Sequence, residues 1–259
     1  MTVDGLRIAL WQGGGTSGAV RDNLDEIAIR AGQASQEGAG LLVFPECFLT
    51  GYVTKSPHDI VEDVTENVTA RLARISRETG LALVVGSYAK CNGRLSNAAF
   101  VFDPQKGLIG TYRKQMLYGD WEKGIFQRGT APLTFTFRKW RIGLLICFDV
   151  EFPETVRHLA RQQCDLIVVP TALMKPFEPV AQHLIATRAL ENQVFVAYAN
   201  RTGTEGSQTY LGQSTVAGPD GKTIVAAEGA EECLLLADLY PGGIALARAD
   251  FVYLDEIGL

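Results

Sequence analysis

Hydrophobic and polar positions along the chain follow two different spacings, and these spacings predict where strands and helices lie. Segments with short apolar or alternating runs, as in buried or half-buried strands, are residues 6–12, 41–45, 81–90, 165–171 and 194–201. Segments with apolar residues at helical spacing are residues 20–38, 64–79, 152–163 and 179–193. Strands and helices are therefore expected to alternate in two portions of the chain.

The middle and the end of the chain have a different pattern, which predicts β-hairpins. Residues 96–114 look like two strands joined by a turn at residues 104–107, and residues 132–147 look like a second hairpin. Residues 212–239 return to the hairpin pattern. Because no linker, low-complexity segment or block of charge marks a boundary, we expect one α/β domain over residues 1–259.

Composition and charge narrow the class of protein. The 259 residues are 47% hydrophobic and 20% charged, as in an ordinary globular protein, and the net charge of −5 argues against a nucleic-acid partner. Five cysteines without a C-x-x-C pair suit a reducing compartment. The first ten residues lack the apolar core of a secretory signal, and no apolar run reaches the ~18 residues that span a bilayer. We therefore expect a cytoplasmic protein that does not associate with membranes.

An acidic residue, Glu46, stands at the end of the apolar run of residues 41–44. It could be an ordinary surface glutamate at a strand end. It could also belong to a dinucleotide site, because Gly13, Gly15 and Gly18 match G-x-G-x-x-G and the acid would then bind a ribose. That match is poor, since closely spaced glycines fit the pattern easily and the helix is expected to start after them. A flexible loop before a helix explains the glycines better.

Two other strand ends carry reactive side chains. Cys147 ends the last apolar strand of the second hairpin, and Lys114 ends the last strand of the first hairpin. Taken singly, a buried cysteine usually behaves as a small hydrophobic residue, and most lysines are solvated surface residues. Together with Glu46, they form a set that can hydrolyse a C–N bond. The carboxylate would take the thiol proton, the thiolate would attack, and the ammonium would stabilise the oxyanion.

Other nucleophilic systems have little support in the sequence. The three histidines, His58, His158 and His183, do not stand in comparable places, which disfavours a Cys–His dyad. The chain has no G-x-S-x-G segment, which removes the common serine hydrolase arrangement. Cys47 lies next to Glu46, but a packed thiol explains it better than a nucleophile does.

Three segments resemble the signature segments of the nitrilase superfamily of carbon–nitrogen hydrolases. They are FPECFLTGY (residues 44–52), YRKQML (residues 112–117) and CFDVEFPE (residues 147–154). The segments SNAAFVFDPQKGLIGTYRK, VVPTAL and RALENQVFVAYANRTG are also similar to family segments, in the family's order. The resemblance extends over nearly the whole chain. It implies an α/β fold of the four-layer αββα sandwich type.

The resemblance also implies a role for each residue of the set. Glu46 would be the general base, Lys114 the cation that stabilises the oxyanion, and Cys147 the nucleophile. Glu122 would match the family's second glutamate, which orients the substrate and the lysine. The main-chain N–H of Phe148 would complete the oxyanion hole. We expect no metal ion or other cofactor and, by resemblance only, a homodimer or a larger homo-oligomer.

The residues that follow the cysteine distinguish branches of the superfamily. Nitrilases proper tend to carry tryptophan and glutamate there, whereas this chain has Phe148 and Asp149, as amidases and carbamoylases do. Carbamoylases that bind a substrate carboxylate carry basic residues at the next positions, where this chain has Val150 and Glu151. We therefore predict an amidase that converts a small carboxamide to a carboxylic acid and ammonia. Neutral or amine-bearing amides should be better substrates than anionic ones.

Several alternatives remain open at this point. An N-carbamoyl-amide hydrolase or a non-catalytic binding protein could share the fold, and a dinucleotide-binding oxidoreductase is a weaker alternative. Side chains expected to contact the substrate are Tyr52, Tyr118, Glu151, Thr171 and Ala172. Glu151 could equally cap the helix that follows it. A preference for anionic substrates would direct the search for their partner to Arg188 or Arg201.

Overall fold

A computed structural model describes residues 5–250, 252–256 and 258 of the chain, and two six-stranded sheets form its centre. The first sheet has the order β14-β1-β2-β3-β4-β5 and the second has the order β13-β12-β9-β8-β7-β6. The strands of the first sheet are β1 (Leu6–Gln12), β2 (Leu41–Val43), β3 (Ala82–Cys91), β4 (Arg94–Asp103), β5 (Gly107–Arg113) and β14 (Cys233–Leu239). Those of the second are β6 (Leu133–Phe137), β7 (Trp140–Leu144), β8 (Leu166–Thr171), β9 (Phe195–Asn200), β12 (Thr215–Ala217) and β13 (Thr223–Ala226).

Helices and a small hairpin complete the structure. The α-helices are α1 (Val20–Gln36), α2 (Pro57–Glu62), α3 (Glu66–Thr79), α4 (Gly119–Ile125), α5 (Pro153–Arg161), α6 (Ile185–Asn192), α7 (Pro241–Asp250) and α8 (Tyr253–Glu256). A 3-10 helix, η1 (Cys147–Glu151), precedes α5, and a π-helical turn, η2 (Val180–Leu184), leads into α6. Strands β10 (Thr204–Glu205) and β11 (Gln208–Thr209) pair with each other.

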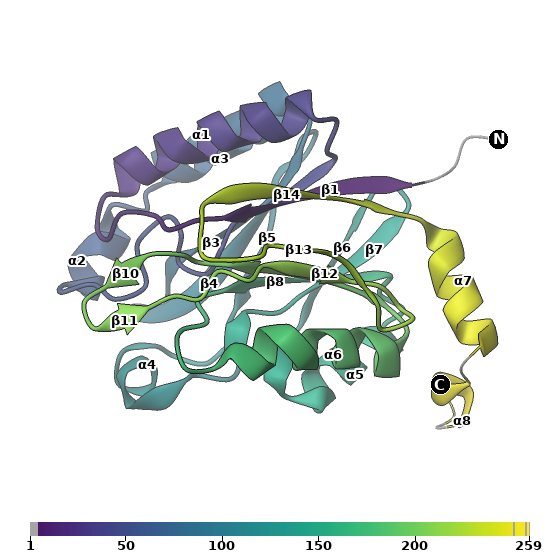
Figure 1. Ribbon diagram of the computed structural model, residues 1–259. Coiled ribbons are helices and arrows are strands. Elements are labelled where there is room, and N and C mark those ends of the chain that lie inside the picture. Colours follow the sequence, from purple (N-terminus) through teal and green to yellow (C-terminus); the bar gives the residue numbers. More distant parts are fainter. Residues whose placement is uncertain (1–4, 251, 257, 259) are drawn as a thin grey trace.

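The sheets and helices are arranged in four layers. Figure 1 shows α1 and α3 outside the first sheet, α5 and α6 outside the second, and the two sheets stacked between them. In each sheet the central strands run parallel, β1 with β2 and β3, and β7 with β8 and β9. Such strands are covered on both faces, which explains their continuous apolar runs. The prediction of a four-layer αββα sandwich is confirmed.

The core fills the space between the two sheets and the layers between each sheet and its helices. One cluster of buried side chains joins strands of both sheets, and a second lies between the first sheet and helices α1 and α3. Helix α1 contributes the stripe predicted from its spacing, with Leu24, Ile27 and Ala31 buried. Ends of the strands that this core holds together carry the candidate site.

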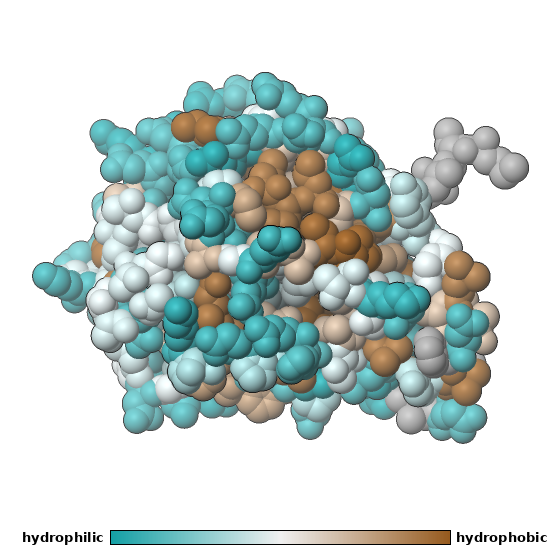
Figure 2. Space-filling view, viewed as in Figure 1, coloured by the Kyte–Doolittle hydropathy of each residue, from teal (hydrophilic) through white to brown (hydrophobic). Residues whose placement is uncertain are grey.

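The prediction of hairpins at the end of the chain is correct only in part. Strands β12 and β13 do form a hairpin, but β14 crosses to the other sheet and pairs antiparallel with β1. This pairing buries Leu235, Ala237 and Leu239 against the core between the sheets. Figure 2 shows hydrophobic side chains gathered on one face over β14, where Leu234 and Leu236 are half-buried.

Two further expectations from the sequence concern a secretory signal and membrane-spanning segments. Residues 1–4, which formed part of the segment judged unlike a secretory signal, lie outside the described residues, as do residues 251, 257 and 259. Within the part of the chain that the structure describes, no helix has the length and apolar character needed to cross a membrane.

Candidate active site

The ends of strands from both sheets meet at one place. Glu46 lies just beyond β2, and its main-chain N–H donates to the carbonyl of Thr171, the last residue of β8, at 3.3 Å. Lys114 follows β5, and its N–H donates to the carbonyl of Asn97 on β4 at 2.8 Å, which extends the strand ladder by one residue. The first sheet thus brings a glutamate and a lysine together, although they are far apart in the sequence, and the second sheet contacts the glutamate through Thr171.

A buried cluster of ionisable groups has the Lys114 ammonium at its centre. Lys114 Nζ lies 2.7 Å from Glu46 Oε1 and 2.8 Å from Glu122 Oε1, and all three side chains have no exposed surface. Two carboxylates so close together would repel each other without the cation between them. The sequence-predicted residues Glu46, Lys114 and Glu122 are therefore in direct contact.

Glu46 has one oxygen held in place and one free. Its Oε1 accepts hydrogen bonds from Lys114 Nζ and from Asn97 Nδ2, the latter at 2.6 Å. Its Oε2 is buried and accepts no hydrogen bond from any residue that the structure describes. Burial raises the pKa of Glu46, an effect that the Lys114 charge opposes and the Glu122 charge reinforces. The free oxygen is therefore well suited to accept a proton.

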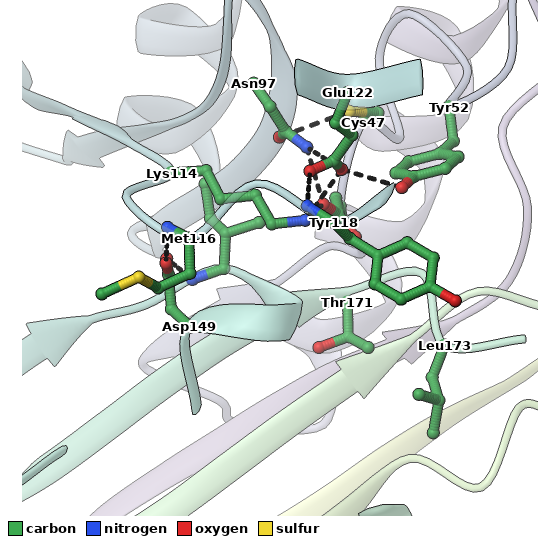
Figure 3. A network of polar contacts seen from close by, with 12 residues as sticks. Cys47, Tyr52, Asn97, Lys114, Met116, Tyr118, Glu122, Asp149, Thr171 and Leu173 are labelled. Atoms are coloured by element: carbon green, nitrogen blue, oxygen red, sulfur yellow. Dashed lines mark hydrogen bonds and ion pairs between the residues drawn. The ribbon is translucent and has the colours of Figure 1, made fainter. Parts of the chain in front are cut away.

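Glu122 connects the lysine to the wall of a cavity. Besides Lys114, its carboxylate accepts the hydroxyl of Tyr52 at 2.8 Å and the main-chain N–H of Tyr118 at 2.6 Å. Tyr118 is the residue before helix α4, so the carboxylate also fixes the start of that short helix. Figure 3 shows the Glu122 carboxylate between the Lys114 ammonium and the Tyr52 hydroxyl, with the Asn97 amide beside it.

Asn97 is a site residue that sequence reasoning missed. Its Nδ2 donates to both carboxylates of the cluster, at 2.6 Å to Glu46 and 3.3 Å to Glu122, and its Oδ1 lies 3.5 Å from the Cys47 sulfur. The signal available in the sequence was the amide of Asn97, next to Ser96, in the mainly apolar segment LSNAAFVF; Asn97 is fully buried in the structure. Buried polar side chains need partners, so such a residue points to a polar site.

Cys147 is the first residue of η1, which follows closely after the end of β7 at Leu144. Its backbone has φ of +46°, a left-handed conformation that is uncommon outside glycine and that often marks functional sites. Burial raises the pKa of the Cys147 thiol and the Glu46 charge raises it further, whereas Lys114 and a backbone hydrogen bond from Ala172 lower it. The thiol is thus close enough to Glu46 and Lys114 to be affected by both charges, and its net pKa lies well above the ordinary value.

Asp149 links the segment that carries Cys147 to the segment that carries Lys114. Its carboxylate accepts the N–H of Ile146 at 3.0 Å and the hydroxyl of Tyr112 at 2.9 Å. It also accepts the N–H of Gln115 at 3.1 Å and of Met116 at 2.7 Å. Sequence reasoning used Asp149 only to choose a branch of the superfamily, and its role in joining the two segments was missed.

A small cavity opens at Cys147. It has a volume of about 130 Å³, and its lining consists of Tyr52, Tyr118, Cys147, Phe148, Glu151, Ala172, Leu173, Met174 and Phe177. Four of the five side chains predicted to contact substrate are among these residues. Thr171 is not: it is fully buried, and its hydroxyl donates to the carbonyl of Val169 at 3.1 Å. Thr171 instead supports the site through its carbonyl, which accepts the N–H of Glu46.

The glycine-rich segment has a packing role in this fold. A Cβ atom on Gly15 would lie 2.0 Å from the carbonyl oxygen of Phe48, and one on Gly14 would lie 2.8 Å from that of Thr202. The glycines thus let the loop after β1 lie against the segment that carries Glu46 and against the segment after β9. Glu46, the acid that the disfavoured dinucleotide alternative would place on a ribose, already contacts Lys114 and Asn97.

Arg201 holds the Glu46 segment from the other side. Its Nη1 donates to the carbonyls of Glu46 and Cys47, at 3.3 and 3.2 Å, and its Nη2 lies 2.6 Å from Glu205 Oε1. The side chain is almost completely buried, 1% exposed. Arg201 is therefore a structural residue of this loop, and it does not line the cavity at Cys147.

Comparisons with known proteins agree on one family. The family model described as carbon-nitrogen hydrolase matches residues 7–249. A protein of Pseudomonas protegens described as a hydrolase in the pqqF 5′ region is 37% identical, over 97% of this chain and 88% of its own length. An (R)-stereoselective amidase of a Pseudomonas species is 32% identical, over 97% of this chain and 91% of its own length.

Solved structures that are similar to this chain include those of an amidase. The crystal structure of an amidase from Nesterenkonia sp. superposes with a TM-score of 0.86 at 35% identity, covering 98% of this chain and 96% of that one. A variant of the same Nesterenkonia amidase carries the acetamide moiety of fluoroacetamide covalently added at its active-site cysteine. Most of the chain therefore has counterparts in sequence and in three dimensions.

Proposed function

The chain belongs to the carbon–nitrogen hydrolase family, and from this premise we propose that it hydrolyses a small carboxamide to the carboxylic acid and ammonia through a thioester on Cys147. The observation that carries the proposal is the position of Cys147. It lines a small cavity and is influenced by the buried charges of Glu46 and Lys114. A protonated thiol, a base with a free oxygen and a fixed cation are the groups that acyl transfer requires.

In the proposed first half-reaction, Glu46 Oε2 takes the Cys147 proton as the sulfur attacks the amide carbon. The negative charge that develops on the amide oxygen is stabilised by the Lys114 ammonium and by the main-chain N–H of Phe148. The tetrahedral intermediate then collapses, the C–N bond breaks, and the proton on Glu46 moves to the departing nitrogen. Ammonia leaves and the acyl group remains on sulfur as a thioester.

In the proposed second half-reaction, Glu46 removes a proton from a water molecule that attacks the thioester carbon. The same cation and N–H stabilise the second oxyanion, the C–S bond breaks, and Cys147 regains a proton from Glu46. Glu122 does not exchange protons in this scheme. It holds Lys114 and Tyr52 in position through the contacts described above. Amide and water are consumed, and acid and ammonia are produced.

Ammonia release from a panel of small amides, N-carbamoyl compounds and nitriles tests the proposal. We expect turnover of amides, and we expect Cys147→Ser to lower kcat by several orders of magnitude because serine is a poor substitute for the thiol. Cys91→Ser, at the half-buried last residue of β3, is the matched control and should retain turnover. Turnover of carbamoyl compounds in preference to amides would instead favour the N-carbamoyl-amide hydrolase.

Mass spectrometry with a slow substrate or a haloacetamide identifies the nucleophile directly. The proposal requires the added mass on the peptide that contains Cys147. Cys47 is the natural competitor because it lies next to Glu46, but it is fully buried and does not line the cavity. Modification at Cys47 with Cys147 unchanged would contradict the assignment.

A further inference from the structure

Glu151 lines the same cavity as Cys147, and its carboxylate has no hydrogen-bond or ion-pair partner among the described residues. The other lining residues are aromatic or apolar apart from the cysteine. No residue within the described part of the chain donates a hydrogen bond to the Glu151 carboxylate or forms an ion pair with it. A half-buried carboxylate without a partner loses hydration and gains nothing in return, so a ligand of opposite charge would stabilise it.

The nearest arginine is engaged elsewhere. Arg188 Nε and Nη2 donate to the main-chain carbonyls of Val150 and Glu151, at 2.9 and 2.7 Å, and its Nη1 lies 2.8 Å from Glu191 Oε1. The arginine therefore fixes the backbone of η1 and leaves the Glu151 side chain to the cavity. Burial raises the pKa of Glu151, while the more distant charges of Lys114 and Arg188 oppose that change.

The alternative role for Glu151, capping of the following helix, finds no support in the contacts. Helix α5 begins at Pro153 with Phe152 before it, and Glu154 is the acidic residue of its first turn. The hydroxyl of Thr155 donates to the carbonyl of Phe152 at 2.8 Å, so the polar contacts there are local to the helix start. Among the described residues, no N–H of α5 donates to Glu151.

A second cavity continues the first and has the same electrostatic character. It has a volume of about 270 Å³ and shares Tyr52, Tyr118 and Met174 with the cavity at Cys147. Asp120 is its charged lining residue, and Trp121 stands beside Tyr52 with ring centroids 5.6 Å apart. No lysine, arginine or histidine is among the described residues that line either cavity. Aromatic rings and carboxylates both attract cations.

We propose that Glu151 is a subsite for an ammonium group on the acyl part of the substrate, so that the preferred substrates are small amides that carry a protonated amine. Asp120 and the aromatic side chains at the second cavity would attract the same charge on its way in. The inference rests on the proposed amidase function and makes it more specific. It goes beyond the absence of basic residues after the cysteine, because it requires a cationic amide to be better than a neutral one of the same shape.

Matched substrates test the subsite in the unmodified protein. Butanamide, 3-aminopropanamide and malonamate have nearly the same size and differ mainly in charge. We expect kcat/KM to be at least about tenfold higher for the cationic amide than for butanamide, as a hydrogen bond to a charged group allows, and lowest for the anion. Rising ionic strength should reduce the cationic advantage. Equal values for the cationic and neutral amides would overturn the subsite.

A conservative substitution assigns the preference to one side chain. Glu151→Gln keeps the shape and removes the charge, so the ratio of kcat/KM for 3-aminopropanamide to that for butanamide should fall at least about tenfold. Glu154→Gln, an exposed glutamate on α5, is the control and should keep the wild-type ratio. An unchanged ratio in Glu151→Gln would overturn the inference.

The two proposals fail in distinguishable ways. If the wild-type protein hydrolyses butanamide without favouring the amine, the amidase function stands and the Glu151 subsite is wrong. If the wild-type protein hydrolyses none of the three amides, the proposed function itself is wrong. Because the substrate comparison uses the wild-type protein, it holds even if Glu151→Gln does not fold.

Discussion

The surroundings of Cys147 disfavour its thiolate form, and this is the reason that a base is needed. Burial is the largest cause of its raised pKa, and the charge of Glu46 is the next. These surroundings favour the protonated thiol over the thiolate, unlike those of cysteines that a neighbouring cation alone holds as thiolates. The free oxygen of Glu46 would take that proton only as the sulfur attacks.

Replacing Glu46 with glutamine should separate the acidity of the cysteine from catalysis. Glu46→Gln removes a negative charge near Cys147, so the pKa of the thiol should fall and its alkylation by iodoacetamide should begin at lower pH than in wild type. Amide turnover should nevertheless fall by several orders of magnitude, because the amide side chain cannot accept the proton. Peptide mass spectrometry across a pH series measures the first effect, and ammonia release the second. An alkylation profile that moves to higher pH would contradict the charge argument.

Asp149 should act as a positioning residue, since it touches the segments of both Lys114 and Cys147 and lies outside the cavity lining. Asp149→Asn replaces one carboxylate oxygen with an NH2 group, which cannot accept the hydrogen bonds that the main-chain N–H groups and Tyr112 donate at this position. We expect unfolding to become easier by about 1–3 kcal/mol and kcat to fall more than KM changes. Tyr112→Phe, which removes one donor and leaves the carboxylate, is the milder comparison. A loss of stability with kcat unchanged would reduce Asp149 to a structural role.

At the scale of elements, the strands and long helices were predictable because their apolar residues repeat at a regular spacing. Helix α1 was expected over residues 20–38 and forms at Val20–Gln36, and the turn between β4 and β5 lies where it was expected. The short helices α2 and α4 were missed, since they bury few side chains and leave little periodic signal. The pairing of β14 with β1 was also missed, because the local spacing of apolar residues does not indicate which distant strands pair.

In the candidate site, too, some residues could be predicted from the sequence and others could not. Glu46, Lys114 and Cys147 could be found because each ends an apolar strand and the segments around them resemble a known family. Asn97 and the joining role of Asp149 could not, because each depends on which strands lie side by side in the folded chain. The reactive side chains could be identified from the sequence, whereas the contacts that hold them in position could be seen only in the structure.

Strand β3 should control the position of Glu46 through a glycine. A Cβ atom on Gly86 would lie 2.2 Å from the carbonyl oxygen of Pro45 and 2.8 Å from Glu46 Cα, so Gly86→Ala must displace that segment. We expect a loss of about 1–3 kcal/mol in unfolding free energy and a marked fall in kcat. Gly32→Ala in helix α1 meets no atom within 4 Å and should be slightly stabilising. Thermal unfolding and ammonia release of both variants decide the point, and normal kcat in Gly86→Ala would show that Glu46 tolerates the shift.

At the scale of the whole molecule, the site belongs to neither sheet alone. Lys114 and Glu46 follow strands of the first sheet, and Cys147 follows a strand of the second. The core cluster between the sheets likewise draws on both of them. We therefore propose that the chain is one cooperative domain. The expected homodimer or larger assembly stays a prediction from the family resemblance, and light scattering in solution would test it.

A single domain should unfold in one transition that every probe follows. Trp11 lies on β1 and Trp140 on β7, so variants that keep only one tryptophan report on the first and the second sheet separately. Denaturant midpoints from both variants should coincide with the loss of amide turnover. Ile8→Ala, a core substitution on β1, should lower the unfolding free energy by about 2–5 kcal/mol and move both fluorescence midpoints together. If the Trp140 signal kept its midpoint while the Trp11 signal moved, the sheets would be separate folding units, and the site between them could open without global unfolding.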